Sequence, residues 1–194
     1  MTTFVLATAN PHKADEMRAV LRPLGIELLE RPEDVPDVEE TGETLEANAL
    51  LKARALVAAT GHAAIADDTG LFVDALGGQP GVRSARYAGE DASYDANVTK
   101  LLEELIDVPD PRAARFVTVI CVAYPDGRTT CVEGVLDGVI TFSRRGDQGF
   151  GYDPVFAPRD AGGRTLAQFT PEQKNELSHR GRALRALSEK LASG

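Results

Sequence analysis

The ten residues Phe4–Lys13, FVLATANPHK, contain the transition from which the fold of this chain can be read. A short apolar run ends at Ala7, a polar turn follows, and Asn10-Pro11 is typical of a helix start, because Asn is a favoured N-cap and Pro fits the first helical turn. The free N–H groups and the dipole of such a turn attract anions. With Thr8, Asn10 and Lys13 adding donors, the stretch predicts a phosphate cradle at the carboxyl end of a strand.

The same residues also suit an ordinary connection between a strand and a helix. The Gly-x-x-x-x-Gly-Lys-Ser/Thr spacing of a Walker A loop is absent from this stretch. The phosphate hypothesis therefore depends on the rest of the chain.

Composition limits the class of protein. A chain of 194 residues can bury one core, as a single domain or as two lobes around a cleft, and 43% hydrophobic with 26% charged residues is ordinary for a soluble globular protein. The net charge of −9 argues against nucleic acid bound over a broad surface. No signal peptide and no apolar stretch of membrane-spanning length is visible, so the sequence predicts no membrane association and a cytoplasmic location.

Two cysteines, Cys121 and Cys131, flank the turn Pro125-Asp126-Gly127. They are expected near each other on paired strands. In a cytoplasmic chain reduced thiols are the expected state, and the absence of a Cys or His cluster argues against a metal site there.

Periodicity and turn residues predict alternating strands and helices followed by a hairpin, which is typical of an α/β fold with a mixed sheet. No repeat or flexible linker is visible, so we expect one domain over residues 1–194. The expected helices cover 11–22, from Thr41 or Thr44 to about Thr60, 94–106 and 176–191, and the expected strands cover 4–8, 26–29, 63–66, 71–73, 116–124, a segment from about 129, and 139–142. We expect loops over 77–89 and 144–165.

Acidic pairs provide candidate metal ligands. Asp67-Asp68-Thr69-Gly70 ends a strand-like run, and Glu39-Glu40 precedes a helix. Neighbouring residues of an extended chain point to opposite sides, so one aspartate can face a site while the other supports it. Carboxylates from separate elements suit Mg²⁺, although ordinary turn chemistry would use the same residues.

Two later segments suit a flat heterocycle. Phe150-Gly151-Tyr152-Asp153 combines aromatic rings, a glycine and a carboxylate, and its rings can stack on a base or close the edge of a core. Lys174, His179 and Arg180 follow around a helix start. Arg180 and protonated Lys174 only donate hydrogen bonds, so they suit an acceptor atom on such a heterocycle. A nucleoside triphosphate requires all of these features together.

In these motifs the chain resembles the inosine triphosphate pyrophosphatase family, also called dITP/XTP pyrophosphatases. The resemblance runs from about Val5 to Leu187. It rests on six motifs in order: Thr8-x-Asn10-x-x-Lys13; Glu39-Glu40-Thr41-Gly42 with Glu46, Asn48-Ala49 and Lys52-Ala53; Ile65-Ala66-Asp67-Asp68-Thr69-Gly70-Leu71; Gly78-x-Pro80-Gly81-x-x-Ser84-Ala85-Arg86-Tyr87; Gly149-Phe150-Gly151-Tyr152-Asp153-Pro154; and Ser178-His179-Arg180-Gly181.

The resemblance implies a fold of two lobes around a long mixed central β-sheet with flanking helices, an active site in the cleft, and a homodimer. It implies Mg²⁺-dependent hydrolysis, with Mn²⁺ as a possible substitute, of ITP, dITP and XTP to the monophosphate and pyrophosphate. Asp68 is then the catalytic base and a metal ligand, with Glu40 as the second ligand and Glu39 as the alternative. The implied substrate-binding residues are Thr8, Ala9, Asn10, Pro11, His12, Lys13, Thr69, Phe150, Gly151, Tyr152, Asp153, Lys174, His179 and Arg180.

The departures from the family pattern are small. Ala9 replaces a frequent glycine, and its Cβ matters only if the backbone there has positive φ. Thr69 replaces a frequent serine and keeps the hydroxyl, and Gln148 stands where a glycine often precedes the loop.

Two other functions remain open at this point. A haloacid-dehalogenase-type phosphatase also uses paired aspartates, but it requires one residue between them, whereas Asp67 and Asp68 are adjacent. A non-catalytic purine nucleotide sensor would bind the same ligand without turnover.

Overall fold

The computed structural model describes residues 2–36 and 38–193. Within them the helices are α1 (Pro11–Leu21), α2 (Leu45–Thr60), α3 (Tyr94–Glu104), α4 (Pro171–Leu177) and α5 (His179–Ala192), with short 3₁₀ turns η1 (Arg22–Leu24), η2 (Asp74–Leu76), η3 (Ser84–Arg86) and η4 (Leu166–Gln168). The strands are β1 (Thr2–Leu6), β2 (Ile26–Leu29), β3 (Ala64–Val73), β4 (Pro80–Gly81), β5 (Ala113–Ala123), β6 (Thr129–Ile140) and β7 (Phe156–Pro158).

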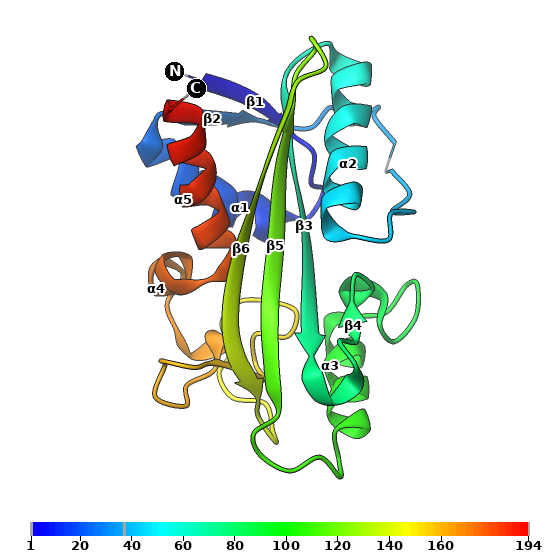
Figure 1. The fold of residues 1–194 in the computed structure, drawn as a ribbon, viewed down its shortest axis with the longest axis vertical. Coiled ribbons are helices and arrows are strands. Elements are labelled where there is room, and N and C mark those ends of the chain that lie inside the picture. Colours follow the sequence, from blue (N-terminus) through cyan, green and yellow to red (C-terminus); the bar gives the residue numbers. More distant parts are fainter. Residues whose placement is uncertain (1, 37, 194) are drawn as a thin grey trace. The chain divides into compact units, whose positions relative to one another are not determined.

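The described strands form one seven-stranded sheet in the order β2-β1-β3-β5-β6-β7, with β4 paired to β3 (Figure 1). Strand β1 is parallel to β2 and to β3, whereas β4 is antiparallel to β3 and β7 to β6. The sheet is therefore mixed, and the predicted α/β class is confirmed.

The chain divides into two compact units, which are described separately. Unit 1 contains Met1–Asp68, Thr118–Gly134 and His179–Gly194, and unit 2 contains Thr69–Val117 and Val135–Ser178. Strands β3, β5 and β6 contribute residues to both units.

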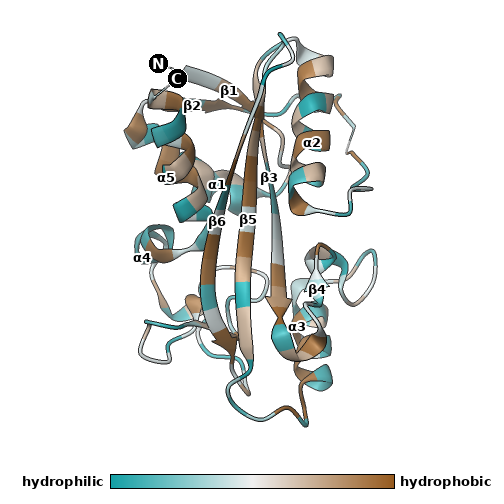
Figure 2. Ribbon diagram, viewed as in Figure 1, coloured by the Kyte–Doolittle hydropathy of each residue, from teal (hydrophilic) through white to brown (hydrophobic). Residues whose placement is uncertain are grey.

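In unit 1 strand β1 is apolar on both faces from Phe4 onward. Phe4 and Leu6 belong to a core with α1 and α5, whereas Val5 and Ala7 belong to a core with α2. Successive side chains of a strand point to opposite faces, so a sheet covered on both faces requires a continuous apolar run. This explains the sequence of β1, and Figure 2 shows hydrophobic residues along β5 and in α2 as well.

Unit 2 has its own core, which joins α3 to β5, β6, β7 and the loop after β6. Leu101 and Leu105 of the α3 segment pack there with Phe116, Phe156 and Tyr152. The ring centroids of Phe116 and Phe156 are 4.7 Å apart. The amphipathic spacing that predicted α3 therefore marks a real buried face.

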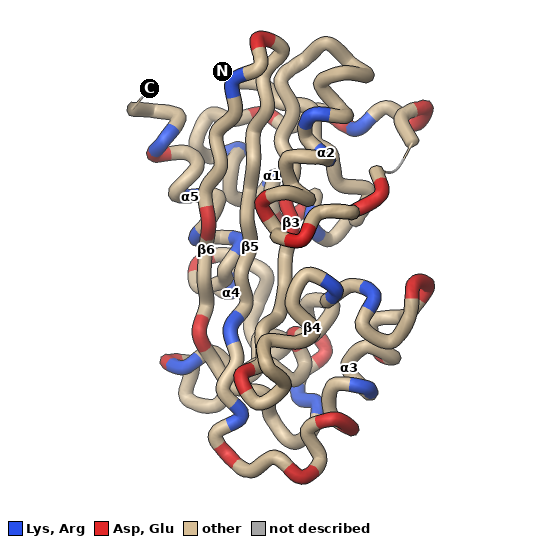
Figure 3. Tube along the Cα trace, turned by 45° about the vertical axis from the view of Figure 1, so that its right-hand side comes forward, with Lys and Arg blue, Asp and Glu red and all other residues tan. Residues whose placement is uncertain are grey.

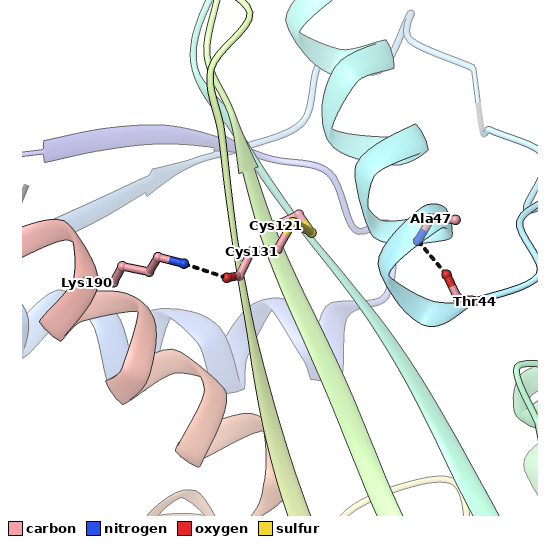
Figure 4. Close-up of a disulfide and its surroundings, with 5 residues drawn as sticks. All are labelled: Thr44, Ala47, Cys121, Cys131 and Lys190. Carbon is pink, nitrogen blue, oxygen red and sulfur yellow. Dashed lines mark hydrogen bonds between the residues drawn. A yellow bond between two sulfur atoms is a disulfide. The ribbon is translucent and has the colours of Figure 1, made fainter.

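The helix starts follow the predicted capping chemistry. The Asn10 side chain caps α1 with Pro11 in the first turn, and Thr44 rather than Thr41 caps α2 by accepting from Ala47 N at 3.1 Å (Figure 4). The predictions for 11–22, 44–60 and 94–106 are confirmed within two residues.

Several predicted boundaries are wrong. The segments 63–66 and 71–73 form one continuous strand, β3, with no turn at Asp67–Gly70. The expected helix over 176–191 is two helices, because Ser178 adopts an extended conformation between α4 and α5. Strand β7 lies in the expected 144–165 loop, β4 lies in the 77–89 loop, and β6 ends at Ile140 rather than continuing to Phe142.

The two cysteines lie on the paired strands β5 and β6, as expected, but the expectation of reduced thiols is wrong, because Cys121 and Cys131 form a disulfide (Figure 4). Both residues stand three positions from their side of the turn at Tyr124–Arg128, where Tyr124 N donates to Arg128 O at 3.0 Å. The hairpin register therefore sets their Cα atoms opposite each other, 4.2 Å apart. Composition could not indicate this register.

Among the described residues, no helix combines the length and the apolar character needed to cross a bilayer.

Candidate active site

The predicted site residues belong to both units. Unit 1 contains the turn Thr8–Lys13, Glu40, Asp68, His179 and Arg180, and unit 2 contains Thr69, the loop Phe150–Asp153 and Lys174. Each group is described within its own unit, and the cleft between lobes remains a prediction.

The β1–α1 turn is held by its own polar side chains. Asn10 Oδ1 accepts from His12 N at 3.0 Å and Lys13 N at 3.4 Å, and Thr8 Oγ1 accepts from Asn10 N at 3.1 Å. No described residue other than glycine has positive φ, so the Cβ of Ala9 causes no strain. The turn is thus a capped helix start, as the sequence predicts, and the N–H groups of Asn10, His12 and Lys13 have partners within it.

This turn borders a pocket of about 710 Å³ in unit 1. Thr8, Asn10 and Pro11 line one side, and the segment 30–33 after β2 lines the other. The pocket leaves the start of α1 accessible to a small ligand.

Lys13 and Arg180 converge on Asp67. Asp67 Oδ2 lies 3.1 Å from Lys13 Nζ and 3.1 Å from Arg180 Nη2, and Arg180 Nη1 also contacts Glu16. The Asp67 side chain is fully buried. Burial opposes its ionisation, but Lys13 and Arg180 outweigh that effect and hold the pKa of Asp67 below its ordinary value. Asp67 is therefore a buried anion that fixes two cations from α1 and α5.

Asp68, the next residue, has different partners. Its Oδ1 lies 3.0 Å from Lys52 Nζ, its Oδ2 accepts from Asn48 Nδ2 at 3.3 Å, and Lys52 Nζ also lies 3.0 Å from Glu40 Oε1. Figure 3 shows the acidic segment in the middle of β3 that these two aspartates form. The two adjacent aspartates thus have different partners, as the alternation of side chains along an extended chain predicts.

Burial raises the pKa of Asp68, and the nearby Glu40 carboxylate raises it further, while Lys52 opposes the shift. A carboxylate with a raised pKa is a better proton acceptor than an ordinary surface aspartate. Asp68 therefore has the environment of a general base.

The carboxylate oxygens of Asp68 and Glu40 are ligands of the type that a divalent cation prefers. Glu40 Oε1 and Asp68 Oδ1 both lie 3.0 Å from one ammonium nitrogen, so two carboxylates approach a single positive charge. Mg²⁺ is commonly bound by one or two carboxylates together with water and substrate phosphates. Across the described ranges, no cluster of three or more His, Cys, Asp or Glu side chains is set for a metal. The structure brings Glu40 to Asp68, whereas Glu39 is exposed.

His179 begins α5 and is buried. Its Nδ1 lies 2.6 Å from Thr118 Oγ1 on β5. On β6, a Cβ at Gly134 would collide with the His179 carbonyl oxygen and with Ala183 N, so the glycine permits the close approach of α5. Gly134 and Thr118 together set the position of His179.

In unit 2 the loop Phe150–Asp153 is built around the Asp153 carboxylate. Asp153 Oδ2 accepts from Phe150 N at 2.9 Å and from Lys174 Nζ at 2.5 Å, and both charged side chains are buried. A Cβ at Gly149 would collide with this oxygen, which explains why glycine precedes Phe150. Lys174 Nζ also lies 4.5 Å from the centroid of the Phe150 ring.

The two aromatic residues of this loop have different environments. Tyr152 is 5% exposed, packs in the unit 2 core and donates its hydroxyl to Ser84 O at 2.8 Å. Phe150 is half-buried. Of the two uses foreseen for these rings, Tyr152 closes the core, and Phe150 is the ring that can stack on a base.

Four residues in direct contact with the predicted site were not predicted as site residues: Asn48, Lys52, Asp67 and Thr118. Asn48 and Lys52 are four residues apart on α2 and so lie on one helix face, which the sequence could have indicated. The partners of Asp67 and Thr118 are 54 to 113 residues away in the chain, and no local pattern indicates them.

Comparison with known proteins identifies the family of this chain. The model of the Ham1 family matches residues 4–190. A dITP/XTP pyrophosphatase from Elusimicrobium minutum is 49% identical, covering 96% of this chain and 98% of the relative, and one from Geobacillus kaustophilus is 49% identical, covering 97% and 94%.

Two solved structures have a fold similar to that of this chain. A HAM1 protein from Coxiella burnetii has a TM-score of 0.90 at 41% identity, with 100% of each chain covered. A nucleoside-triphosphatase / dITP/XTP pyrophosphatase from Mycobacterium abscessus has a TM-score of 0.77 at 46% identity, covering 98% of this chain and 100% of that one. This protein is therefore a member of the Ham1 family.

Proposed function

We propose that this protein hydrolyses deaminated purine nucleoside triphosphates, namely ITP, dITP and XTP, to the nucleoside monophosphate and pyrophosphate. The observation that carries the proposal is the position of Asp68, a buried carboxylate with a raised pKa that shares Lys52 with Glu40. The names of the relatives, dITP/XTP pyrophosphatase, support the same substrate class.

At the phosphate end, the side chains of Thr8, Asn10 and Lys13 offer donors beside the positive end of the α1 dipole. These groups would bind the triphosphate and stabilise the negative charge of departing pyrophosphate. Asp67 keeps Lys13 at this place through the 3.1 Å ion pair.

At the reacting centre, Asp68 would orient a water molecule and accept its proton. Glu40 and Asp68 would hold Mg²⁺, or Mn²⁺ in its place, with Glu39 as the alternative ligand. Bound Mg²⁺ supplies charge neutralisation on the phosphoryl oxygens. Lys52 adds a positive charge. Burial lowers the pKa of its ammonium group, but the carboxylates of Asp68, Asp67 and Glu40 outweigh this effect and raise the pKa above its ordinary value.

At the base end, Phe150 would stack on the purine and Lys174 would donate to a 6-keto oxygen, with Thr69 and the loop Gly151–Asp153 beside them. A base with an amino donor at that position would leave the donor unpaired, which is costly in a buried site. This argument favours hypoxanthine and xanthine over adenine.

The alternatives are less well supported. A haloacid-dehalogenase-type phosphatase needs one residue between its aspartates, and here Asp67 and Asp68 are adjacent with Asp67 engaged by Lys13 and Arg180. A non-catalytic sensor does not require a carboxylate with a raised pKa.

We also propose that the protein is a homodimer and that it acts in the cytoplasm on the nucleotide pool. The mass of the protein measured in solution tests the homodimer.

The experiment is a panel of ITP, dITP, XTP, GTP and ATP with Mg²⁺, in which monophosphate, pyrophosphate and inorganic phosphate are quantified separately. The proposal expects pyrophosphate and monophosphate from the first three. Release of inorganic phosphate from the nucleotide would support the phosphatase, and binding without products would support the sensor.

A further inference from the structure

Tyr94 is an exposed aromatic residue at the start of α3, directly after the N-cap Ser93. Its side chain is 41% exposed, although large aromatic residues are usually buried. The ring nevertheless has a defined partner, because its centroid lies 5.9 Å from that of Phe150 at an interplanar angle of 42°. Tyr94 therefore contacts the loop to which the proposed function assigns the purine.

The backbone around Phe150 does not by itself determine where its ring points. Gly149 and Gly151 on either side have φ of 74° and 64°, in the left-handed region, and Phe150 N is fixed to Asp153. The orientation of the ring thus depends on side chains that touch it. Lys174 Nζ lies over the ring at 4.5 Å from its centroid, and Tyr94 is tilted against it.

Tyr94 itself stands on a fixed element. Ser93 caps α3 by accepting from Ala96 N at 3.1 Å. Arg144, in the same loop region as Phe150, donates to Thr99 Oγ1 at 2.7 Å and lies 3.0 Å from the Asp95 carboxylate. The first turn of α3 is therefore tied to the loop at two places, by Arg144 and by Tyr94.

We infer that Tyr94 is a positioning residue that holds the Phe150 ring in the orientation needed to stack on a planar heteroaromatic base. The inference rests on the proposed function for the identity of the ligand. A tilted aromatic pair adds a stabilisation that favours one ring orientation before the ligand arrives, and this lowers the cost of ordering Phe150 on binding. Tyr94 acts through Phe150 and contacts no reacting atom.

The test compares Tyr94→Ala and Tyr94→Phe with the wild type. Phe142→Ala is the matched control, because Phe142 is also an exposed aromatic of unit 2 and its ring packs against Arg112. For each protein we would measure KM and kcat for dITP, inhibition by inorganic tripolyphosphate, which has no base, and the Kd of IMP by calorimetry.

Tyr94→Ala is expected to raise KM for dITP and Kd for IMP about three- to tenfold, while kcat and tripolyphosphate inhibition stay within twofold. Tyr94→Phe and Phe142→Ala should match the wild type. The inference is overturned if Tyr94→Ala leaves the Kd of IMP unchanged, if it weakens tripolyphosphate inhibition equally, or if Tyr94→Phe loses as much as Tyr94→Ala.

The two proposals can fail separately. A wild type that binds IMP but releases no pyrophosphate from dITP would refute the proposed function, and the IMP comparison would still decide the role of Tyr94. A wild type that binds no IMP would refute the role of Tyr94, whatever its turnover.

Discussion

Arg180 and Asp67 are 113 residues apart in the chain, and Arg180 Nη2 lies 3.1 Å from Asp67 Oδ2 with both side chains buried. Because Asp67 Oδ2 also receives Lys13 at 3.1 Å, one carboxylate links α5 and β3 to the start of α1. The turn between β1 and α1 is thus supported by a charge network that no single segment of the sequence contains.

Removal of the Asp67 carboxylate should strongly destabilise the protein. Asp67→Ala would remove this ion pair from Lys13 and leave the buried Arg180 with Glu16 as its remaining carboxylate, and removing one partner of a buried ion pair typically costs about 3–5 kcal/mol. Urea unfolding followed by circular dichroism measures the change. Asp126→Ala is the control, because Asp126 pairs with Arg128 on an exposed turn and should not change the midpoint. Equal effects of both variants would contradict this assignment.

Arg180→Ala should affect the phosphate end as well as dITP turnover. The sequence assigns Arg180 to the base, but its bonds to Glu16 and Asp67 connect it with Lys13. We therefore expect KM for dITP and the inhibition constant of pyrophosphate to rise by similar factors, in protein shown by its melting curve to be folded. A rise in KM for dITP with an unchanged inhibition constant of pyrophosphate would contradict this prediction and would show that Arg180 acts on the base alone.

Stability should fall at alkaline pH because of Tyr152. Burial raises the pKa of its phenol, so above about pH 10 the unfolded chain loses this proton while the folded protein retains it. Linkage then lowers the free energy of unfolding as pH rises, by up to about 1.4 kcal/mol per pH unit for one group. Urea unfolding between pH 8 and pH 11 should show a shallower decline for Tyr152→Phe than for the wild type. Identical slopes would contradict the prediction.

Reduction of the disulfide should destabilise unit 1 modestly. Cys121 and Cys131 are ten residues apart, and closing so short a loop stabilises by about 2–3 kcal/mol at most. Thermal unfolding with and without dithiothreitol measures the difference, and Cys121→Ser with Cys131→Ser together should remove the effect of the reductant. A reductant effect that persists in the double variant would exclude this disulfide as its cause.

Local sequence patterns predicted much of the fold. Asn10, Thr44 and Ser93 cap helices whose limits the sequence indicated, because capping is a contact within four residues. Phe4–Leu6 was correctly assigned to a buried strand, and residues 116–123 to a strand, from their apolar runs.

The errors arose where remote residues determine the structure. Asp67-Asp68-Thr69-Gly70 has the composition of a turn, yet β3 continues through it, because Lys13, Lys52 and Arg180 compensate the buried carboxylates. The spacing of Asn48 and Lys52 indicates one face of α2, but the contacts of Lys52 with residues 12 and 16 positions away on other elements required the fold. The contacts that support the candidate site residues required the fold.

The role of Asp68 tests the account most directly. Asp68→Asn should reduce kcat for pyrophosphate release from dITP by roughly 10²–10⁴-fold, because the amide cannot accept the proton of the attacking water. Its melting temperature should equal or exceed that of the wild type, since burial disfavours the ionised carboxylate in the folded protein. Near-full activity in a folded Asp68→Asn protein would contradict the account.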